Sequence, residues 1–289
     1  MLKKNELEGI LPKVKAAAFD ACSCLYREDT DLKIETKGPH DYLTYVDLFV
    51  SEYLMSHLPK LLPGSIVTSE ESKEPAQAYA ENGSAPYRWI IDPIDGTNNL
   101  VYGLPFYSVS IGLVCKDAPA KLPPQEAAIL GVVYHPPSGE LFSAAQGAGA
   151  YVENMLIPGK PPKAIGVSSE TDLDRAIIMC ETDPYFDREK NPSMDLIKAV
   201  YKNCIDCRIT GSAALDMSYL AAGRAHVHFC RHLSPWDYAG GAAILTEAGG
   251  IASQWDGSPI SFETGKHTNL ASNNRVIHEA MLEIVQNFI

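Results

Sequence analysis

The 289-residue sequence has no apolar stretch of the roughly twenty residues that a membrane-spanning helix needs. Its first residues, Met1 to Glu6, also lack the apolar core of a secretory signal peptide. Basic side chains are scarce, because 24 lysine and arginine residues stand against 36 aspartate and glutamate residues, a formal net charge of −12. This balance argues against nucleic-acid binding through the phosphate backbone. These absences predict a soluble protein that acts on neither membranes nor nucleic acids.

Several common active-site motifs are also missing. There is no P-loop and no serine nucleophile elbow, and the run Gly147-Ala148-Gly149 lacks the third glycine of a dinucleotide fingerprint. Seven cysteines, an odd number without an export signal, predict reduced thiols and a cytoplasmic location. The pairs Cys22/Cys24 and Cys204/Cys207 have spacings that a zinc site could use. Ordinary core thiols are the better interpretation, because the first pair falls within a helical pattern.

Residues 89–97 read Trp-Ile-Ile-Asp-Pro-Ile-Asp-Gly-Thr, an apolar strand that runs directly into a turn and a helix start. Pro93 cannot donate to a strand ladder, and the turn that follows brings Asp92 and Asp95 close together. Their mutual repulsion is tolerable only if cations bind between them. The backbone amides of Gly96 and Thr97, at the start of the helix, can bind phosphate oxygens that the same cations hold. This stretch predicts a metal and phosphate site.

Other carboxylates occupy similar positions at the ends of elements. Asp47 lies in the first turn of an amphipathic segment, and Glu70 and Glu71 follow the short apolar strand 66–68. Asp237 lies in the first turn of an alanine- and glycine-rich helix that ends before Gly249. Each of these residues alone could be a helix cap or a surface charge. Together with the first pair, they predict an oxygen-rich site for hard cations.

These motifs resemble those of the inositol monophosphatase family of magnesium-dependent, lithium-sensitive phosphatases. Residues 92–99, Asp-Pro-Ile-Asp-Gly-Thr-Asn-Asn, are similar to its first signature, and residues 236–240, Trp-Asp-Tyr-Ala-Gly, are similar to its second. Further segments fit the family in order: Glu70 to Ser72, Gly139 to Ala144, Gly147 to Ala150 and Gly211 to Ala214. The resemblance covers nearly the whole chain.

The resemblance implies a site of two or three Mg²⁺ ions, with Mn²⁺ as a possible substitute. The implied metal ligands are Glu70, Asp92, the backbone carbonyl of Ile94, Asp95 and Asp237. The implied catalytic residues, which position and deprotonate the attacking water, are Glu70, Thr97 and, through Thr97, Asp47. The implied substrate contacts are Asp95, Gly96, Thr97, Gly211, Ser212, Ala213 and Cys230.

The resemblance also implies the fold, a five-layered α-β-α-β-α sandwich of the inositol monophosphatase and fructose-1,6-bisphosphatase type. The whole chain, 1–289, is then one compact phosphatase domain of two packed halves. The first half, about 1–155, is α+β and binds the metals, and the second, about 156–289, is α/β. The chain shows no internal repeat and no independent linker, and the resemblance suggests a homodimer.

Apolar periodicity predicts the individual elements. Two N-terminal helices precede the acidic turn, and residues 107–115, 128–134 and 140–145 form an antiparallel meander, because turns such as 136–139 cannot hold crossover helices. Residues 117–124 are expected to be an exposed hairpin loop. In the second half, strands and helices alternate over the segments 176–180, 193–201, 207–210, 213–222, 224–230 and 237–248. His226 and His228 lie in this predicted last strand and are interpreted as buried or hydrogen-bonded structural residues.

The predicted function is magnesium-dependent hydrolysis of small phosphate monoesters by a metal-activated water, with inositol 1-phosphate as the leading substrate. Residues 98–100, Asn-Asn-Leu, resemble the branch of the family that acts on polyol and sugar phosphates. Cys230 stands where inositol monophosphatases place a glutamate that contacts a ring hydroxyl, which puts inositol specificity in doubt. Fructose-1,6-bisphosphate, histidinol phosphate and 3′(2′),5′-bisphosphate nucleotides remain open as substrates. A regulatory role that binds the transcription machinery remains open as a different class of function.

Overall fold

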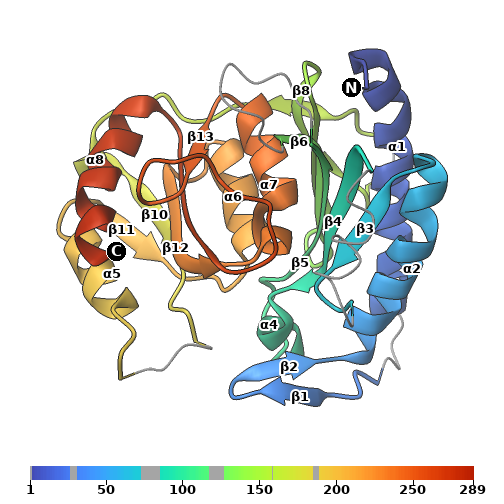
Figure 1. The fold of residues 1–289 in the computed structure, drawn as a ribbon, viewed down its shortest axis with the longest axis horizontal. Helices are drawn as coiled ribbons and strands as arrows, with labels where there is room; N and C mark the ends of the chain where they lie inside the picture. The colour runs from blue at the N-terminus through green and yellow to red at the C-terminus, as the bar shows by residue number, and fades with distance from the viewer. Residues whose placement is uncertain (1, 27–30, 73–84, 117–126, 158, 185–188) are drawn as a thin grey trace.

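Two large β-sheets, with helices between them and on both outer faces, make up most of the protein (Figure 1). The computed structural model describes residues 2–26, 31–72, 85–116, 127–157, 159–184 and 189–289. The predicted hairpin loop 117–124 therefore lies outside the described residues. Within them, no helix has the length and apolar character that crossing a membrane would require.

The larger sheet has seven strands, and their order in the sheet is their order in the chain. Only the first pair is parallel; all later pairs are antiparallel, which confirms the predicted meander. Its strands are β3 (Ile66–Ser69), β4 (Tyr87–Asp95), β5 (Ser108–Cys115), β6 (Ala127–His135), β7 (Glu140–Ala145), β8 (Gly149–Asn154) and β9 (Lys163–Ile165).

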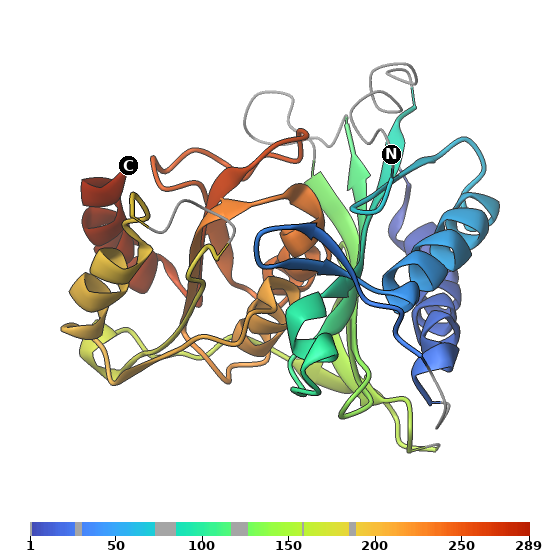
Figure 2. The ribbon, with the colours of Figure 1, turned by 90° about the horizontal axis from the view of Figure 1, so that it is seen from below.

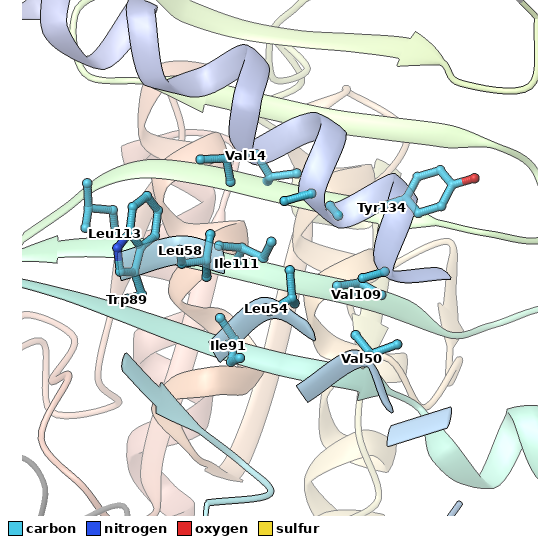
Figure 3. Close-up of a cluster of buried hydrophobic side chains, with 14 of the residues drawn as sticks. Val14, Val50, Leu54, Leu58, Trp89, Ile91, Val109, Ile111, Leu113 and Tyr134 are labelled. Atoms are coloured by element: carbon cyan, nitrogen blue, oxygen red, sulfur yellow. The ribbon is translucent and has the colours of Figure 1, made fainter. Parts of the chain in front are cut away.

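Helices α1 (Lys4–Ala21) and α2 (Tyr45–Leu61) cover the outer face of this sheet. Trp89 and Ile91 of β4 point to these helices, whereas Ile90 packs on the opposite side, as the alternation of a strand requires. Figure 3 shows the resulting apolar layer, in which Leu54 and Leu58 of α2 lie over the strands. Because both faces of β4 are buried, its central residues Trp89, Ile90 and Ile91 are apolar in succession instead of alternating with polar residues.

Helices α6 (Ala213–Ala221) and α7 (Pro235–Glu247) fill the space between the sheets. Small residues let α7 approach the seven-stranded sheet closely. A Cβ atom at Gly131 of β6 would lie 2.2 Å from the backbone oxygen of Gly240, and one at Gly112 of β5 would lie 2.6 Å from Cβ of Ala239. This close contact packs α7 directly against β5 and β6.

We expect Gly131→Ala to destabilise the protein by about 2 kcal/mol or more, because the new methyl group would meet a backbone oxygen that no side-chain rotation can move. Thermal or urea unfolding measures the effect. Gly9→Ala in α1 is the matched control, since nothing lies within 4 Å of the added Cβ and alanine favours a helix. Equal stability of the two variants would contradict this close approach.

The smaller sheet has five strands in the order β11-β10-β12-β14-β13. Strand β10 is parallel to β11 and β12, and the remaining pairs are antiparallel. Its outer face is covered by α5 (Ser193–Tyr201) and α8 (Arg275–Val285) (Figures 1 and 2). The strands are β10 (Ile177–Cys180), β11 (Asp206–Arg208), β12 (Val227–Leu233), β13 (Ile251–Ser253) and β14 (His267–Ser272).

The five layers α1/α2, sheet, α6/α7, sheet and α5/α8 confirm the predicted sandwich. The predicted boundary between the two halves, near residue 155, stays a prediction. Short elements complete the fold: β1 (Glu35–Gly38) and β2 (Asp41–Leu43), which form a hairpin beside α4 (Thr97–Val101), and the 3₁₀ turns Cys22–Tyr26, Leu173–Arg175 and Gln286–Phe288.

One predicted strand begins later than expected. Residues 224–226 were expected to start it, but the amide of Arg224 donates to the Tyr219 carbonyl, and Gly223 has a φ of +71°. Gly223 and Arg224 therefore form the C-terminal cap of α6, which ends at Ala221. The strand β12 runs instead from Val227 to Leu233, and the predicted strand 207–210 is likewise shifted, to Asp206–Arg208.

Candidate functional site

A pocket of about 720 Å³ opens where the ends of β3, β4 and β12 meet the starts of α4 and α7. It is lined by acidic residues from segments that lie far apart in the sequence. The predicted site residues on its wall are Glu70, Asp92, Ile94, Asp95, Gly96, Thr97, Gly211, Ala213, Cys230 and Asp237. The structure therefore brings the two motifs, which are more than a hundred residues apart, to one cavity.

The end of β4 places Asp92 and Asp95 in the pocket wall. Asp92 pairs with Ser110 of β5 and Asp95 with Ser108, and the ladder is interrupted between these two pairs. Pro93 thus interrupts the strand rather than ending it, because it lacks an N–H for the ladder. Both carboxylates are buried, and Oδ1 of Asp92 has no hydrogen-bond partner among the residues that the structure describes. An unpartnered buried carboxylate oxygen is what a cation ligand looks like before the ion binds.

Asp95 is oriented by donors from the loop before α6. Its Oδ2 accepts a hydrogen bond of 2.7 Å from the Ser212 hydroxyl and one of 2.8 Å from the Ala214 amide. Ser212 is fully buried, so its hydroxyl serves Asp95, while Gly211 and Ala213 line the cavity on either side of it. The segment 211–214 therefore holds a predicted metal ligand in place.

Charge repulsion and burial act together on the carboxylates. Burial raises the pKa of Asp92 well above its usual value, and the charges of Glu70, Asp95 and Asp237 raise it further. Burial, followed by the charge of Asp237, raises the pKa of Asp95 to about 7. Burial likewise raises the pKa of Asp237 to about 7. The site holds more negative charge than the protein neutralises, which favours binding of a cation.

Asp237 lies in the first turn of α7, as predicted. Its Oδ2 accepts a 2.7 Å hydrogen bond from the Ser234 amide, and the Ser234 side chain caps the helix in return. Gly249, with a φ of +91°, follows the C-cap residue and confirms the predicted glycine stop. The helix start fixes the position of this carboxylate at the pocket.

Thr97 and Asp47 form the contact that the family resemblance implied. The Thr97 hydroxyl lies 2.8 Å from Oδ1 of Asp47 and 2.9 Å from the carbonyl oxygen of Ile94. Oδ2 of Asp47 accepts hydrogen bonds from the backbone and side chain of Thr44, the N-cap of α2. Burial raises the pKa of Asp47, while the hydrogen bonds from Thr44 and Thr97 lower it.

Gly96 allows the chain to turn from β4 into α4. Its φ is +95°, and a Cβ atom would lie 2.6 Å from the Phe106 oxygen and 3.0 Å from the Gly211 oxygen. Any other residue would therefore be strained and also push the two pocket walls apart. The N-terminus of α4, at Thr97, faces the same cavity as the carboxylates.

Lys37 is a pocket residue that the sequence did not reveal. Its Nζ lies 3.2 Å from Oε1 of Glu70 and also contacts Glu71. Burial, followed by the charge of Glu70, raises the pKa of Glu71 to about 7. Lys37 lies in the β1–β2 hairpin, 33 residues before Glu70, and no local pattern links the two positions.

Cys230 does line the pocket, and a carboxylate lies beside it. Its thiol donates to Oδ1 of Asp183 at 3.3 Å, and Oδ2 of Asp183 accepts a 2.6 Å hydrogen bond from the Ser193 hydroxyl. Asp183 is buried and has a φ of +50°. Nδ1 of His232 lies 3.6 Å from the same carboxylate oxygen. Asp183 was missed because it follows β10, far in sequence from either motif.

The two histidines of the predicted strand separate in the structure. His226 lies before β12, and its Nδ1 accepts a 2.9 Å hydrogen bond from the Ile177 amide, which confirms a structural role. His228 lies within β12 and is fully buried, as predicted. All seven cysteines are free thiols, and those outside the 204/207 pair are buried.

The fold and the site define a layered α/β protein whose carboxylates converge on one pocket. The model of the inositol monophosphatase family matches residues 5–289, and the chain belongs to this family. An inositol-1-monophosphatase of Mesorhizobium japonicum is 29% identical over 286 residues, which cover 99% of this chain and 98% of the relative. The Nus factor SuhB of Escherichia coli is 32% identical over 257 residues, 89% of this chain and 87% of that protein.

Solved structures show the same fold. The inositol monophosphatase of Anabaena superposes with a TM-score of 0.76 at 26% identity and covers 98% of this chain and 97% of its own. A structure of an IMPase/NADP phosphatase complexed with Mg²⁺ and phosphate has a TM-score of 0.78 at 22% identity, over 96% and 95% of the two chains. The second likeness concerns the fold alone.

Proposed function

We propose that the protein is a magnesium-dependent phosphatase of small phosphate monoesters, with inositol 1-phosphate or a related polyol or sugar phosphate as substrate. Membership of the inositol monophosphatase family supports a phosphatase. The observation that carries the proposal is the convergence of Asp92, Asp95 and Asp237 on the pocket that α4 and Thr97 border. Such a site can neutralise a phosphate and place a nucleophile next to it.

The residues present fit Mg²⁺, because all their ligand atoms are oxygens and Oδ1 of Asp92 has no other partner. The ligands would be Glu70, Asp92, the Ile94 carbonyl, Asp95 and Asp237, holding two or three ions. Bound Mg²⁺ would neutralise the phosphate charge and lower the pKa of a bound water.

The protein's own contribution is to orient and deprotonate that water. Asp47 lies within hydrogen-bond distance of the Thr97 hydroxyl, so Thr97 can accept a proton from the water as it passes its own to Asp47. Thr44 holds Asp47 in place for this transfer. Ser212 and the Ala214 amide fix Asp95 in the same way, so the pocket is preorganised.

Phosphate release from a substrate panel tests the proposal. Inositol 1-phosphate, fructose 1,6-bisphosphate, histidinol phosphate, 3′-phosphoadenosine 5′-phosphate and glycerol 2-phosphate are compared with and without Mg²⁺, using a colorimetric phosphate assay. We expect magnesium-dependent release that is fastest with a polyol phosphate. Release from none of these esters would overturn the proposed activity. A preference for fructose 1,6-bisphosphate, histidinol phosphate or 3′-phosphoadenosine 5′-phosphate would replace inositol 1-phosphate as the leading substrate.

The competing function is a regulatory one, which the 32% identity to a protein named as a Nus factor favours. A chain that acts by binding the transcription machinery keeps that binding when its metal ligands are removed. Pull-down with the Asp95→Asn variant distinguishes the two functions, because a phosphatase loses its activity and a binding protein does not lose its partner.

We also propose a cytoplasmic homodimer, and analytical ultracentrifugation measures the assembly.

Lithium is expected to inhibit the enzyme. Li⁺ is a hard cation that can occupy an all-oxygen Mg²⁺ site without supplying the second positive charge. Phosphate release is measured against increasing Li⁺ at fixed Mg²⁺, with Na⁺ at equal concentration as the control for ionic strength. Mn²⁺ should replace Mg²⁺, whereas soft thiophilic ions should not. Equal effects of Li⁺ and Na⁺ would exclude the lithium-sensitive mechanism.

Asp183 is expected to perform the hydroxyl recognition that Cys230 cannot. A hydrogen bond to a charged group contributes about 1.5–3 kcal/mol, so Asp183→Ala should lower kcat/KM for inositol 1-phosphate relative to glycerol 2-phosphate by about tenfold or more. Cys230→Ser is the matched control, since it keeps a donor to Asp183. An unchanged ratio in a folded, active Asp183→Ala enzyme would show that this carboxylate does not meet the substrate.

A further inference from the structure

A second cluster of side chains able to bind a metal lies beside the pocket and contains none of the predicted magnesium ligands. Glu181 directly follows β10, Asp216 lies on α6, and His228 lies on β12. One carboxylate oxygen from each acid and a ring nitrogen of the histidine all lie within 4.8 Å of one another. Glu181 also lines the pocket, so the cluster is reached from there.

Each of the three side chains has a polar atom without a hydrogen-bond partner in the part of the chain that the structure describes. Asp216 and His228 are fully buried. Among the described residues, no hydrogen-bond partner is found for Oε1 of Glu181, Oδ2 of Asp216 or the two ring nitrogens of His228, and the side chain of Asn269 is the polar neighbour of the ring. Each buried polar group left in this way costs free energy. One ligand atom from each of the three residues lies around one point, so a group bound there would satisfy polar atoms of all three side chains.

Within the described ranges, the two acids are not compensated by a basic side chain. Among the described residues, no lysine or arginine forms an ion pair with Glu181 or Asp216. Oδ1 of Asp216 accepts a 2.7 Å hydrogen bond from the Thr210 hydroxyl, and the Asp216 carboxyl group also meets that of Glu181. Two buried carboxylates need a proton or a cation between them. A shared proton would link the two acids but would leave the unpartnered nitrogens of His228 unexplained.

We propose that Glu181, Asp216 and His228 form a further metal site, which binds one divalent transition ion of the Zn²⁺, Co²⁺ or Mn²⁺ type. Imidazole together with carboxylates suits these ions, whereas Mg²⁺ prefers oxygen ligands alone. Three protein ligands leave a coordination position for water. The site therefore differs in metal preference from the oxygen-only cluster around Asp92.

The fold supports the placement of all three ligands. Strands β10 and β12 are parallel neighbours with Cys180 opposite Phe229. Glu181 comes one residue after this pair on one strand, and His228 comes one residue before it on the other. Helix α6 packs on β12 and carries Asp216 to the same point. Burial lowers the pKa of His228 to about 4, so its ring is neutral at pH 7 and has a lone pair for a metal. An ion here would join the central helix layer to the smaller sheet.

Metal content tests the site independently of enzyme activity. The full chain is freed of metal with a chelator, saturated with Mg²⁺ to fill the oxygen-only ligands, and then dialysed against Co²⁺ or Zn²⁺. Bound metal is measured by mass spectrometry, and the visible absorption of Co²⁺ reports nitrogen coordination. We expect one transition ion per chain that excess Mg²⁺ does not displace.

Variants locate the ion. His228→Phe and Glu181→Gln should each weaken binding of Co²⁺ by at least about tenfold, because even partners outside the ligand shell contribute 10–100-fold. His278→Gln is the matched control, since His278 is also buried but is hydrogen-bonded to Ser253 and Ser272. Anomalous diffraction from wild-type crystals soaked in Co²⁺ places the ion without any substitution. Absence of a peak at the cluster, or binding that His228→Phe leaves unchanged, overturns the proposal in favour of a shared proton.

Discussion

Asp95→Asn is expected to fold normally and to lose at least about a hundredfold of the magnesium-dependent phosphatase activity. Changes at partners outside the ligand shell of a metal site cost roughly 10–100-fold, so loss of a direct ligand should cost at least as much. Its amide oxygen can still accept from Ser212 and the Ala214 amide, so the local structure is kept. Steady-state kinetics over a range of Mg²⁺ concentrations measures the loss.

A matched control separates this effect from a general effect of losing one negative charge. Asp195 lies on α5, in the outermost layer and outside the pocket lining, so Asp195→Asn should leave activity within about twofold of the wild type. We also expect Asp95→Asn to be no less stable than the wild type without metal, because a repelling charge has been removed from beside Asp237. Near-normal turnover by the folded variant would remove Asp95 from the ligand set.

Without metal, the free energy of unfolding is expected to fall as the pH rises from about 4 to 7. Mg²⁺ is expected to restore this stability at higher pH. The pKa values of Asp95 and Asp237 are raised in the folded chain from 3.8 to about 7. Between these values the folded state binds more protons than the unfolded state, so the free energy of unfolding decreases with increasing pH. A shift of this size corresponds to about 4 kcal/mol for one such group.

Thermal unfolding at pH 5 and pH 8, with a chelator or with saturating Mg²⁺, measures this linkage. At pH 8 the carboxylates are ionised, and Mg²⁺ at a hundred times its Kd should stabilise by about 3 kcal/mol. At pH 5 protons occupy the same oxygens, so Mg²⁺ should have little effect. Asp95→Asn should flatten the pH dependence. A magnesium effect of equal size at both pH values would show that these carboxylates do not bind the ion.

Local sequence was sufficient wherever one segment contains all the parts of a feature. Thr44 caps α2 and contacts Asp47 three residues later, and Ser234 and Asp237 form the same arrangement at α7. The strand–turn–helix from β4 into α4 was also predictable, because apolar strand, proline and glycine follow one another directly. The meander was predictable because its turns are too short for any other connection.

The boundaries of elements were less predictable where two signals compete. Residues 224–226 directly precede the apolar part of β12 and were predicted to belong to it, yet the hydrogen bond from the Arg224 amide to the Tyr219 carbonyl makes Arg224 part of the C-terminal cap of α6. The C-terminal end of a helix depends on where its last carbonyl groups find hydrogen-bond donors. That choice depends on the length of α6 once it is packed between the sheets, which periodicity alone does not reveal.

The sequence by itself determined the family-like motifs, the carboxylates at the C-terminal end of β4 and at the start of α7, and the succession of elements. Tertiary structure alone decided which side chains meet across long separations. Lys37 reaches Glu70, Asp183 lies beside Cys230, and Glu181, Asp216 and His228 converge. The physical reason is that caps, turns and periodicity act over a few residues, whereas these contacts depend on strand register and on the packing of helices between two sheets.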